Sequence, residues 1–490
     1  MSEQPLDPFA IPEFPPATRQ IYVNRTLNLR GIKAIGYDMD YTLVHYNAKE
    51  WEDRAFWYVQ QRLLDQGWPV GDLKFDHDAI IRGLIIDTEL GNLLKVNRFG
   101  YVKKARHGTR LLDFGGQRKV YSREVVDLAD ARYVFLNTFF SVSEAHMYAL
   151  LVDMLDRGEL PGVSTYGELY KMVRKSLDAA HMEGQLKADI VADPARYVLF
   201  DPDTPRTLMD QKEAGKKVLL ITNSWWTFTR QMMTLCFDPY MPAGTTWRDL
   251  FDLIIVAANK PAFFVDRSQL FEVINDDEML RPTGLPLEPG KIYFGGNASL
   301  VERSLGISGS DILYVGDHVY GDVHVSKSIR RWRTGLIVRE LEEELDGLEQ
   351  FGEGQVRLTA LMEEKVRREY RMSHLRLNRQ RFANGHVQYN VDLAAFDAEL
   401  ARLRDDIVSI DDQIRPLAVA SQAVSNPTWG MLMRAGNDKS YFARQLERHA
   451  DIYMSRVSNF LFETPYVYLR SHRGSLPHDS GAMLNPYNTD

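Results

Sequence analysis

Two aspartates separated by a single residue, Asp38 and Asp40, follow a short apolar run in the stretch IKAIGYDMDYTL. Acidic residues are unfavourable in strands, so a strand that ends on two carboxylates suggests chemistry. Because residues i and i+2 of a strand point to the same side, both carboxylates can address one substrate. One could attack an electrophile such as the phosphorus of a phosphate ester, and the other could transfer protons. The alternative is that Asp38 and Asp40 are ordinary solvated residues of a turn.

Three further apolar runs also end in polar residues with distinct chemistry. The run VLLI precedes Thr222, Asn223 and Ser224, the run LIIVAAN precedes Lys260, and the run ILYVG precedes Asp317 and Asp322. Each run alone has an ordinary explanation, such as a helix N-cap or a solvated loop lysine. In open α/β sheets, however, ligands bind beyond the carboxyl ends of the strands. If the four runs belong to one parallel sheet, these side chains meet in one crevice.

The surrounding elements support such a sheet. Between about residues 205 and 340, strand-like runs alternate with segments long enough for helices, which is typical of parallel strands joined by crossover helices. From about residue 340 onward, charges of both signs interleave with apolar residues at helical spacing, as in FDAELARLRDDIVSIDDQI. The sequence therefore predicts an α/β fold followed by a C-terminal helical region with a long antiparallel helix pair.

The composition narrows the class of protein. With 490 residues the chain is too long for one core. The 59 Lys and Arg residues against 67 Asp and Glu residues give a formal charge of -8, which argues against a dedicated nucleic-acid binder. The single cysteine, Cys236, excludes an intramolecular disulfide, and we find neither a signal peptide nor a membrane-spanning run. We therefore expect a soluble cytoplasmic protein without membrane or nucleic-acid partners.

The four motifs and two further segments together carry a family resemblance. The segments GYDMDYTL, ITNSWW, NKPAFF and DILYVGDHVYGDV, with DTELGNLLKV and VRKSLDAAHMEG, resemble the cytosolic purine 5′-nucleotidase family of the haloacid dehalogenase superfamily. The resemblance extends from about residue 22 to about residue 480. It implies a Rossmann-like parallel-sheet core with an inserted cap domain. The expected parts are an N-terminal arm with the first part of the core (1–49), the cap (50–204), the remainder of the core (205–342) and the helical region (343–490).

For the motif residues, phosphate chemistry and the resemblance suggest specific roles. Asp38 would be the nucleophile that forms an aspartyl-phosphate, and Asp40 the general acid and base. Thr222 would hydrogen-bond the phosphate, Lys260 would offset negative charge, and Asp322 would orient Lys260. A magnesium ion would be held by the hard oxygen ligands of Asp38, Asp317 and, by family resemblance, the backbone carbonyl of Asp40.

Substrate choice is expected to depend on the segment VRKSLDAAHMEG. Arg174, Asp178 and His181 are spaced so that they share one face of a helix; an ordinary surface salt bridge is the alternative. The resemblance assigns base recognition to these three residues, base stacking to Phe140 and contact with the phosphate to Lys187, with Asn223 and Ser224 beside them. An Arg donor and an Asp acceptor match the O6 and N1–H edge of hypoxanthine or guanine, so IMP and GMP are the expected substrates.

Three other functions remain open from the sequence. The protein could pass the phosphoryl group to a nucleoside, act as a phosphatase on another ester, or be an inactive scaffold that uses its helical region for partners. The complete set of motif residues argues against the scaffold. The resemblance also implies self-association as a dimer or tetramer.

Overall fold

The structure is a computed structural model that describes residues 14–182 and 184–472, without the side chains of residues 180–182. Contacts divide the described chain into two compact units. The first unit comprises the residues up to 342 together with 432–471, and the second, here called the helical unit, comprises residues 343–431.

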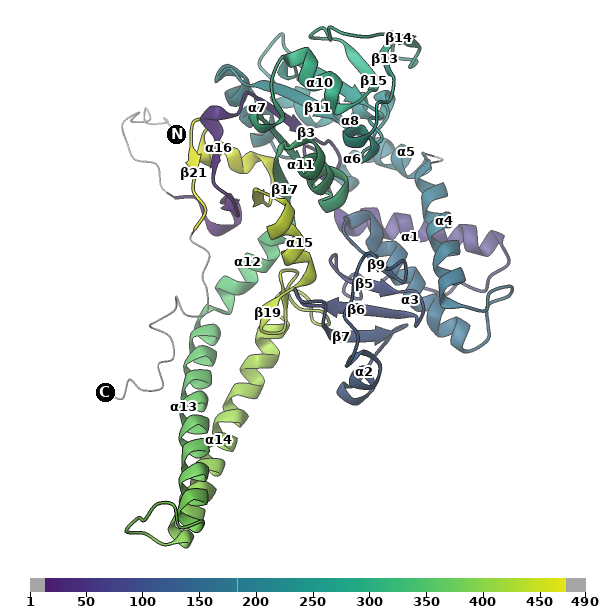
Figure 1. Cartoon of the computed structure of the whole chain (residues 1–490). Helices are drawn as coiled ribbons and strands as arrows, with labels where there is room; N and C mark the ends of the chain where they lie inside the picture. Colours follow the sequence, from purple (N-terminus) through teal and green to yellow (C-terminus); the bar gives the residue numbers. More distant parts are fainter. Residues whose placement is uncertain (1–13, 183, 473–490) are drawn as a thin grey trace, which may run out of the picture. The chain divides into compact units, whose positions relative to one another are not determined.

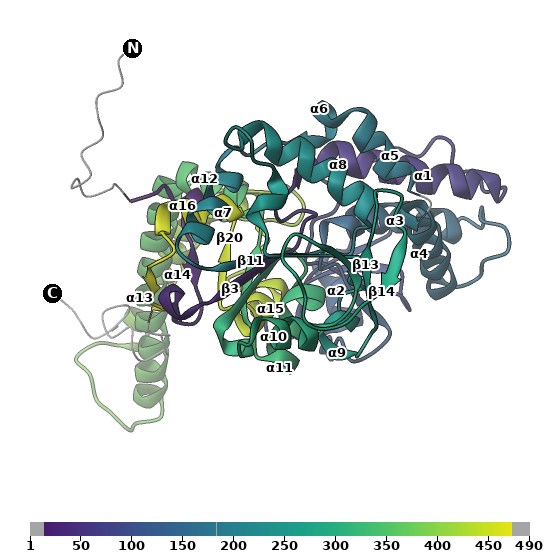
Figure 2. The same cartoon turned by 90° about the horizontal axis from the view of Figure 1, so that it is seen from above.

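The first unit contains a ten-stranded sheet in the order β1-β20-β17-β16-β3-β11-β12-β15-β13-β14. Figures 1 and 2 label several of its strands, among them β3 and β11. All neighbours from β20 to β15 pair in parallel, which confirms the predicted α/β class. The parallel strands are β20 (Ile452–Met454), β17 (Arg333–Ile337), β16 (Ile312–Gly316), β3 (Ala34–Tyr37), β11 (Lys217–Ile221), β12 (Leu253–Val256) and β15 (Ile292–Gly295). The antiparallel edge strands are β1 (Tyr22–Val23), β13 (Leu270–Val273) and β14 (Leu280–Pro282).

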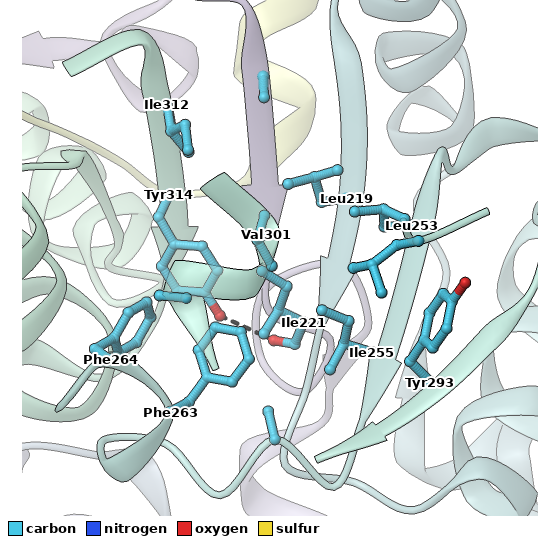
Figure 3. Packing of buried hydrophobic residues seen from close by; sticks show 14 of the residues in the cluster. Leu219, Ile221, Leu253, Ile255, Phe263, Phe264, Tyr293, Val301, Ile312 and Tyr314 are labelled. Atoms are coloured by element: carbon cyan, nitrogen blue, oxygen red, sulfur yellow. Dashed lines mark hydrogen bonds between the residues drawn. The ribbon is translucent and has the colours of Figure 1, made fainter. Parts of the chain in front are cut away.

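Alternation along the strands creates the core. Leu219 and Ile221 of β11, like Leu253 and Ile255 of β12, point to the same face of the sheet because side chains of a strand alternate. There they pack with Tyr314 and with the helical segment that carries Phe263 and Phe264 (Figure 3). The helices that follow the strands near this core are α9 (Ala262–Val265), α10 (Ala298–Leu305) and α11 (Val325–Arg330). α7 (Asp203–Glu213) contacts β11, and Gln211 accepts a hydrogen bond of 2.7 Å from Tyr37.

A long segment is inserted between β3 and β11. The chain enters it through β4 (His45–Tyr46) and leaves it through β10 (Val198–Leu199), which pair antiparallel. Its helices are α1 (Ala48–Asp65), α2 (Phe114–Tyr121), α3 (Val142–Asp156), α4 (Tyr166–Met182), α5 (Gln185–Ala192) and α6 (Pro194–Tyr197). Its five-stranded antiparallel sheet contains β5 (Ile85–Asp87), β6 (Asn92–Val96), β7 (Val102–His107), β8 (Arg110–Leu111) and β9 (Tyr133–Phe135). The cap predicted for residues 50–204 falls within this inserted segment and stays a prediction.

The expected helical region 343–490 differs from the structure after residue 431. Residues 432–471 belong to the first unit, where α15 (Tyr441–His449) leads into β20. Ile452 and Met454 of this three-residue strand are fully buried, and β20 extends the parallel sheet beside β17. The sequence did not predict this return because a three-residue strand is too short to show a pattern of its own. In the structure, burial of its apolar side chains stabilises it.

In the helical unit, α13 (Gly352–Ala383) and α14 (Leu393–Gln422) lie side by side (Figure 1). Ion pairs join Lys365 to Asp411, Arg368 to Asp406 and Arg379 to Asp397. As the residue number rises along one helix it falls along the other, so the pair is antiparallel, as predicted. Among the helices within the described ranges, none has the length and apolar character needed to cross a bilayer.

Gly36 in the centre of β3 lies against the ring of Tyr314. A Cβ atom at this position would stand 2.9 Å from Cδ2 of Tyr314. That ring cannot easily move, because Phe264 and Trp332 pack against it at centroid distances of 5.3 and 6.0 Å. Its hydroxyl also donates a hydrogen bond of 2.9 Å to the carbonyl of Ile221 (Figure 3).

We therefore expect Gly36→Ala to destabilise the protein by about 1–3 kcal/mol, the usual cost of overpacking a filled core. Urea unfolding and the melting temperature would measure the change. Gly71→Ala is the matched control, since its nearest neighbour outside the adjoining residues, Leu64 Cδ2, would be at an ordinary 3.7 Å. Equal stability of the two variants would contradict this account.

Glu52 of α1 is buried against the start of α3. Its Oε2 accepts a hydrogen bond of 2.6 Å from the backbone N–H of Ser143. Burial raises the pKa of Glu52 from 4.5 to about 8, although this hydrogen bond opposes the shift. The unfolded chain loses this proton near pH 4.5 and the folded protein holds it to about pH 8, so the free energy of unfolding falls as the pH rises through this window.

Replacing Glu52 by Gln removes the titration and retains an acceptor for Ser143. Relative to the wild type, the variant should gain stability between pH 5 and pH 8, on the order of 1–3 kcal/mol at the upper end. Melting temperatures measured at pH 5, 6.5 and 8 would test this, with the exposed Glu349→Gln as control. A difference between variant and wild type that does not change with pH would refute the expectation.

Candidate active site

The predicted motif residues follow neighbouring strands of the parallel sheet. Asp38 follows β3, Thr222 follows β11, Lys260 lies beyond β12 and Asp317 follows β16. Because these strands are parallel, their carboxyl ends lie at one edge, and the structure brings the side chains of Asp38, Lys260 and Asp322 into direct contact there. The backbone N–H of Asp38 donates a hydrogen bond of 2.9 Å to the carbonyl of Val315, which fixes the end of β3 against β16.

Lys260 is the centre of this group. Its buried ammonium lies 2.8 Å from Oδ1 of Asp38 and 2.8 Å from Oδ1 of Asp322. It also donates a hydrogen bond of 2.9 Å to the hydroxyl of Tyr314. Burial alone would lower the pKa of Lys260, but Asp322 and Asp38 outweigh it and raise the pKa well above its ordinary value. The lysine therefore stays charged and holds the two carboxylates.

A third carboxylate, that of Asp317, lies beside Asp38 and Asp322. Ligand oxygens of Asp38, Asp317 and Asp322 all lie within 4.8 Å of one another. Burial raises the pKa of Asp38 to about 7, against the opposing charge of Lys260, and raises that of Asp317 well above its usual range, with the charges of Asp322 and Asp38 adding to the effect. Oδ2 of Asp317 is buried and has no hydrogen-bond partner among the described residues.

This arrangement fits a hard cation. Lys260 contacts two of these three buried carboxylates. The unpartnered oxygen of Asp317 is an available ligand of the type that Mg²⁺ prefers. Asp38 and Asp317 would hold the ion, as the sequence predicts. Asp322 is within reach as well, but its Oδ1 is already paired with Lys260 and its Oδ2 accepts from the backbone N–H of His318 at 3.2 Å.

The carboxylate of Asp40 points into a different network. Its Oδ1 accepts a hydrogen bond of 2.6 Å from the hydroxyl of Tyr46, and its Oδ2 accepts one of 2.6 Å from the hydroxyl of Ser224. Lys187 in turn donates to the oxygen of Ser224 at 2.9 Å. The two aspartates of the first motif therefore have separate surroundings, Asp38 beside the acidic cluster and Asp40 beside hydroxyl groups.

Thr222 and Asn223 organise the loop after β11. The hydroxyl oxygen of Thr222 accepts a hydrogen bond of 3.1 Å from the backbone N–H of Ser224. The amide of Asn223 exchanges two hydrogen bonds with the backbone of Lys260, of 2.6 and 3.1 Å. These contacts hold the loops that follow β11 and β12 together, so both residues have a local structural role besides their predicted contact with phosphate.

A cavity of about 1170 Å³ opens above this edge of the sheet. Predicted site residues that line it are Asp40, Phe140, Arg174, Asp178, Lys187, Asn223 and Ser224. Trp51, Trp225, Phe228 and His318 contribute further walls. The side chain of His181 lies outside the described residues, so its predicted role stays a prediction.

The two residues predicted to recognise the base, Arg174 and Asp178, contact each other, and Arg174 also contacts Glu144. Nε of Arg174 lies 3.1 Å from a carboxylate oxygen of Asp178, and Nη1 lies 3.0 Å from Oε2 of the buried Glu144. The Arg174 and Asp178 side chains are 48% and 53% exposed, so the pair is open to the cavity. Because Asp178 engages Nε and Glu144 engages Nη1, the guanidinium of Arg174 has further N–H groups that can donate to a ligand.

Sequence reasoning missed several residues of the site. Tyr46 and Glu144 contact Asp40 and Arg174 as described above. Arg82 donates a hydrogen bond of 3.3 Å to the carbonyl of Asp317, and its guanidinium lies between the rings of Phe139 and Phe442 at 4.8 and 4.9 Å. An arginine within the apolar stretch AIIRGLII was a visible signal. Tyr46 and Glu144 carried none: Tyr46 is only six residues from Asp40 but belongs to no recognised motif, and Glu144 is 30 residues from Arg174.

Comparisons with known proteins show the family of the chain. A model of the 5′ nucleotidase family matches residues 21–481. The human 5′-nucleotidase domain-containing protein 2 is 29% identical over 491 residues, an alignment that covers 95% of this chain and 86% of the human protein.

Similarities to solved structures are more distant. An archaeal β-phosphoglucomutase from Pyrococcus sp. strain ST 04 is 11% identical, with a TM-score of 0.29, and the match covers 62% of this chain and 86% of the other. A predicted phosphoglycolate phosphatase from Haemophilus somnus is 13% identical, with a TM-score of 0.28, and the match covers 63% and 86%. Because these scores are low, the fold assignment depends on the sheet described above. Since the family model matches nearly the whole chain, this protein belongs to the 5′ nucleotidase family and is a phosphoric monoester hydrolase.

Proposed function

We propose that the protein hydrolyses 6-oxopurine nucleoside monophosphates, IMP and GMP, with Mg²⁺ as cofactor and an aspartyl-phosphate on Asp38 as intermediate. The single observation that carries this proposal is the composition of the cavity. One space is lined by Asp40, Lys187 and Ser224 and also by Arg174 and Asp178. It therefore offers both groups that can act on a phosphate and groups that can recognise a purine.

The reaction needs a nucleophile that is held in place and charge-compensated. Lys260 fixes one oxygen of Asp38 at 2.8 Å, and the carboxylate attacks phosphorus as the bond to the leaving oxygen breaks. Asp40 supplies a proton to that oxygen and later takes one from the water that hydrolyses the aspartyl-phosphate. Mg²⁺, held by Asp38 and Asp317, would neutralise charge on the phosphoryl group. Lys187, whose ammonium lies 2.9 Å from Ser224, adds positive charge at the cavity wall.

Base recognition follows from the donor and acceptor pattern. Arg174 donates hydrogen bonds and Asp178 accepts them, which matches the O6 and N1–H groups of hypoxanthine and guanine. Adenine reverses both groups, so it would leave Arg174 and Asp178 without partners on the base. Phe140 offers an aromatic face on the same cavity. Transfer of the phosphoryl group to a nucleoside hydroxyl in place of water would use the same residues.

Removal of Mg²⁺ should abolish turnover. With excess EDTA, hydrolysis of a nucleotide should fall below about 1% of its value at saturating Mg²⁺, since the metal supplies several kcal/mol of charge stabilisation. Asp317→Asn should raise the Mg²⁺ concentration for half-maximal activity at least about 10-fold. Full activity in EDTA, or an unchanged Mg²⁺ requirement in Asp317→Asn, would disprove the metal assignment.

Substrate selectivity tests the base assignment. The kcat/KM values of the wild type for IMP and GMP should exceed those for AMP, CMP and UMP by about 10- to 100-fold. This range is below the 10⁴ that fully buried hydrogen-bonding sites reach, because Arg174 and Asp178 are half exposed. Pyrimidines should react poorly because a smaller ring cannot both stack on Phe140 and reach the pair.

Two variants complete this test. Arg174→Ala and Asp178→Ala should each remove most of the preference for IMP over AMP and leave hydrolysis of para-nitrophenyl phosphate nearly unchanged. The proposal fails if the wild type hydrolyses AMP and IMP equally well, or if Asp178→Ala keeps its preference for IMP.

A further inference from the structure

One contact in the reaction centre joins a buried tyrosine to the proposed proton donor, Asp40. The hydroxyl of Tyr46 donates a hydrogen bond of 2.6 Å to Oδ1 of Asp40. Tyr46 is only 3% exposed. It lies on β4, opposite Val198 of β10, in the strand pair through which the chain enters and leaves the inserted segment. The proposed proton donor is therefore held by a buried side chain of a hydrogen-bonded strand pair.

The two oxygens of Asp40 are not equivalent. Oδ2 accepts from Ser224, which also accepts from Lys187, and both of these residues line the cavity. A phosphate group in the cavity would compete for the Ser224 hydroxyl and the Lys187 ammonium. Tyr46 does not line the cavity, so its hydrogen bond to Oδ1 would persist when substrate binds.

Aromatic packing fixes the Tyr46 ring. Its centroid lies 4.7 Å from that of Trp51 and 5.2 Å from that of Tyr41. Trp51 lines the cavity and packs edge-on against Phe140 at 5.3 Å. The hydroxyl of Tyr46 therefore cannot leave Asp40 without disturbing the wall on which the base is proposed to stack.

We propose that Tyr46 is the positioning residue for the proton donor. By occupying Oδ1, it leaves Oδ2 as the oxygen that carries the transferable proton, on the side of the cavity. When Asp38 bonds to phosphorus, the bond from phosphorus to the ester oxygen breaks and its electron pair stays on that oxygen. The ester oxygen then takes the proton from Oδ2 of Asp40, and Tyr46 stabilises the carboxylate that remains. This inference rests on the proposed role of Asp40.

The dependence of the rate on the leaving group tests the proposal. An alkoxide such as the 5′-oxygen of a nucleoside needs a proton as it leaves, whereas para-nitrophenolate does not. Tyr46→Phe removes only the hydroxyl. It should lower kcat/KM for IMP at least about 10-fold and change kcat/KM for para-nitrophenyl phosphate less than about 3-fold. Both values are taken on one preparation, so their ratio is independent of the fraction of protein that folds.

Tyr41→Phe is the matched control. Tyr41 is buried in the same aromatic cluster, at 3% exposure, and within the described part of the chain its hydroxyl has no hydrogen-bond partner. This variant should keep the wild-type ratio of the two kcat/KM values. Tyr46→Phe with equal losses on both esters, with no loss on IMP, or with no activity on either ester would overturn the inference.

Failure of the proposed substrate is a separate result. If the wild type does not hydrolyse IMP, the nucleotide assignment fails, and the comparison is made with ribose 5-phosphate or glycerol phosphate, which are also alkyl esters. A selective loss on the alkyl ester would still support the role of Tyr46. Equal effects on alkyl and aryl esters would exclude it whichever substrate is correct.

Discussion

The site depends on one buried ammonium. Lys260 lies between Asp38 and Asp322 at 2.8 Å from each, and its side chain is 3% exposed. A buried charge is stable only when it is paired and hydrogen-bonded. Removing the lysine would leave two buried carboxylates close to a third, Asp317, without the positive charge that compensates them. Burial, the larger effect, raises the pKa of Asp38 to about 7, whereas the ion pair that joins these strand ends lowers that pKa.

One side chain of the sheet, Tyr314, connects the ion pairs of Lys260 with the apolar core. Tyr314 of β16 accepts a hydrogen bond from Lys260 and donates one to Ile221 of β11, so a single side chain joins two strands and the ion pair. Its ring is packed against Gly36, where a side chain has no room. The apolar core shown in Figure 3 and the charged group above it therefore share one residue, and a change in packing below must reach the charges above.

The inserted segment supplies the second half of the site. Phe140, Arg174 and Lys187 come from it and line the same cavity as Ser224 of the sheet. Tyr46 lies at the junction between the two and contacts Asp40. The geometry thus links the wall proposed for the base to the residue proposed to protonate the leaving group. In this wall, the buried carboxylate of Glu144 pairs with the guanidinium of Arg174.

The sequence by itself determined which polar residues follow the parallel strands. It also determined the family. Local signals were sufficient for this, because Asp38, Thr222, Lys260 and Asp317 each directly follow an apolar run, and parallel strands must bring such ends to one edge. The charged helical pattern likewise predicted the pair α13 and α14. Both are properties of short segments, whose periodicity can be read without knowledge of the partners.

Only the tertiary structure decided which atoms meet. It pairs Asp40 with Tyr46 and Ser224, Arg174 with Glu144, and Asp317 with Arg82. It also returns residues 432–471 to the first unit, where Ile452 and Met454 of β20 become buried beside β17. Asp40 and Tyr46 are six residues apart. The other partners are far apart in the sequence, and β20 is too short to show a period. Long-range packing and the burial of charge select these contacts, and neither leaves a local pattern in the chain.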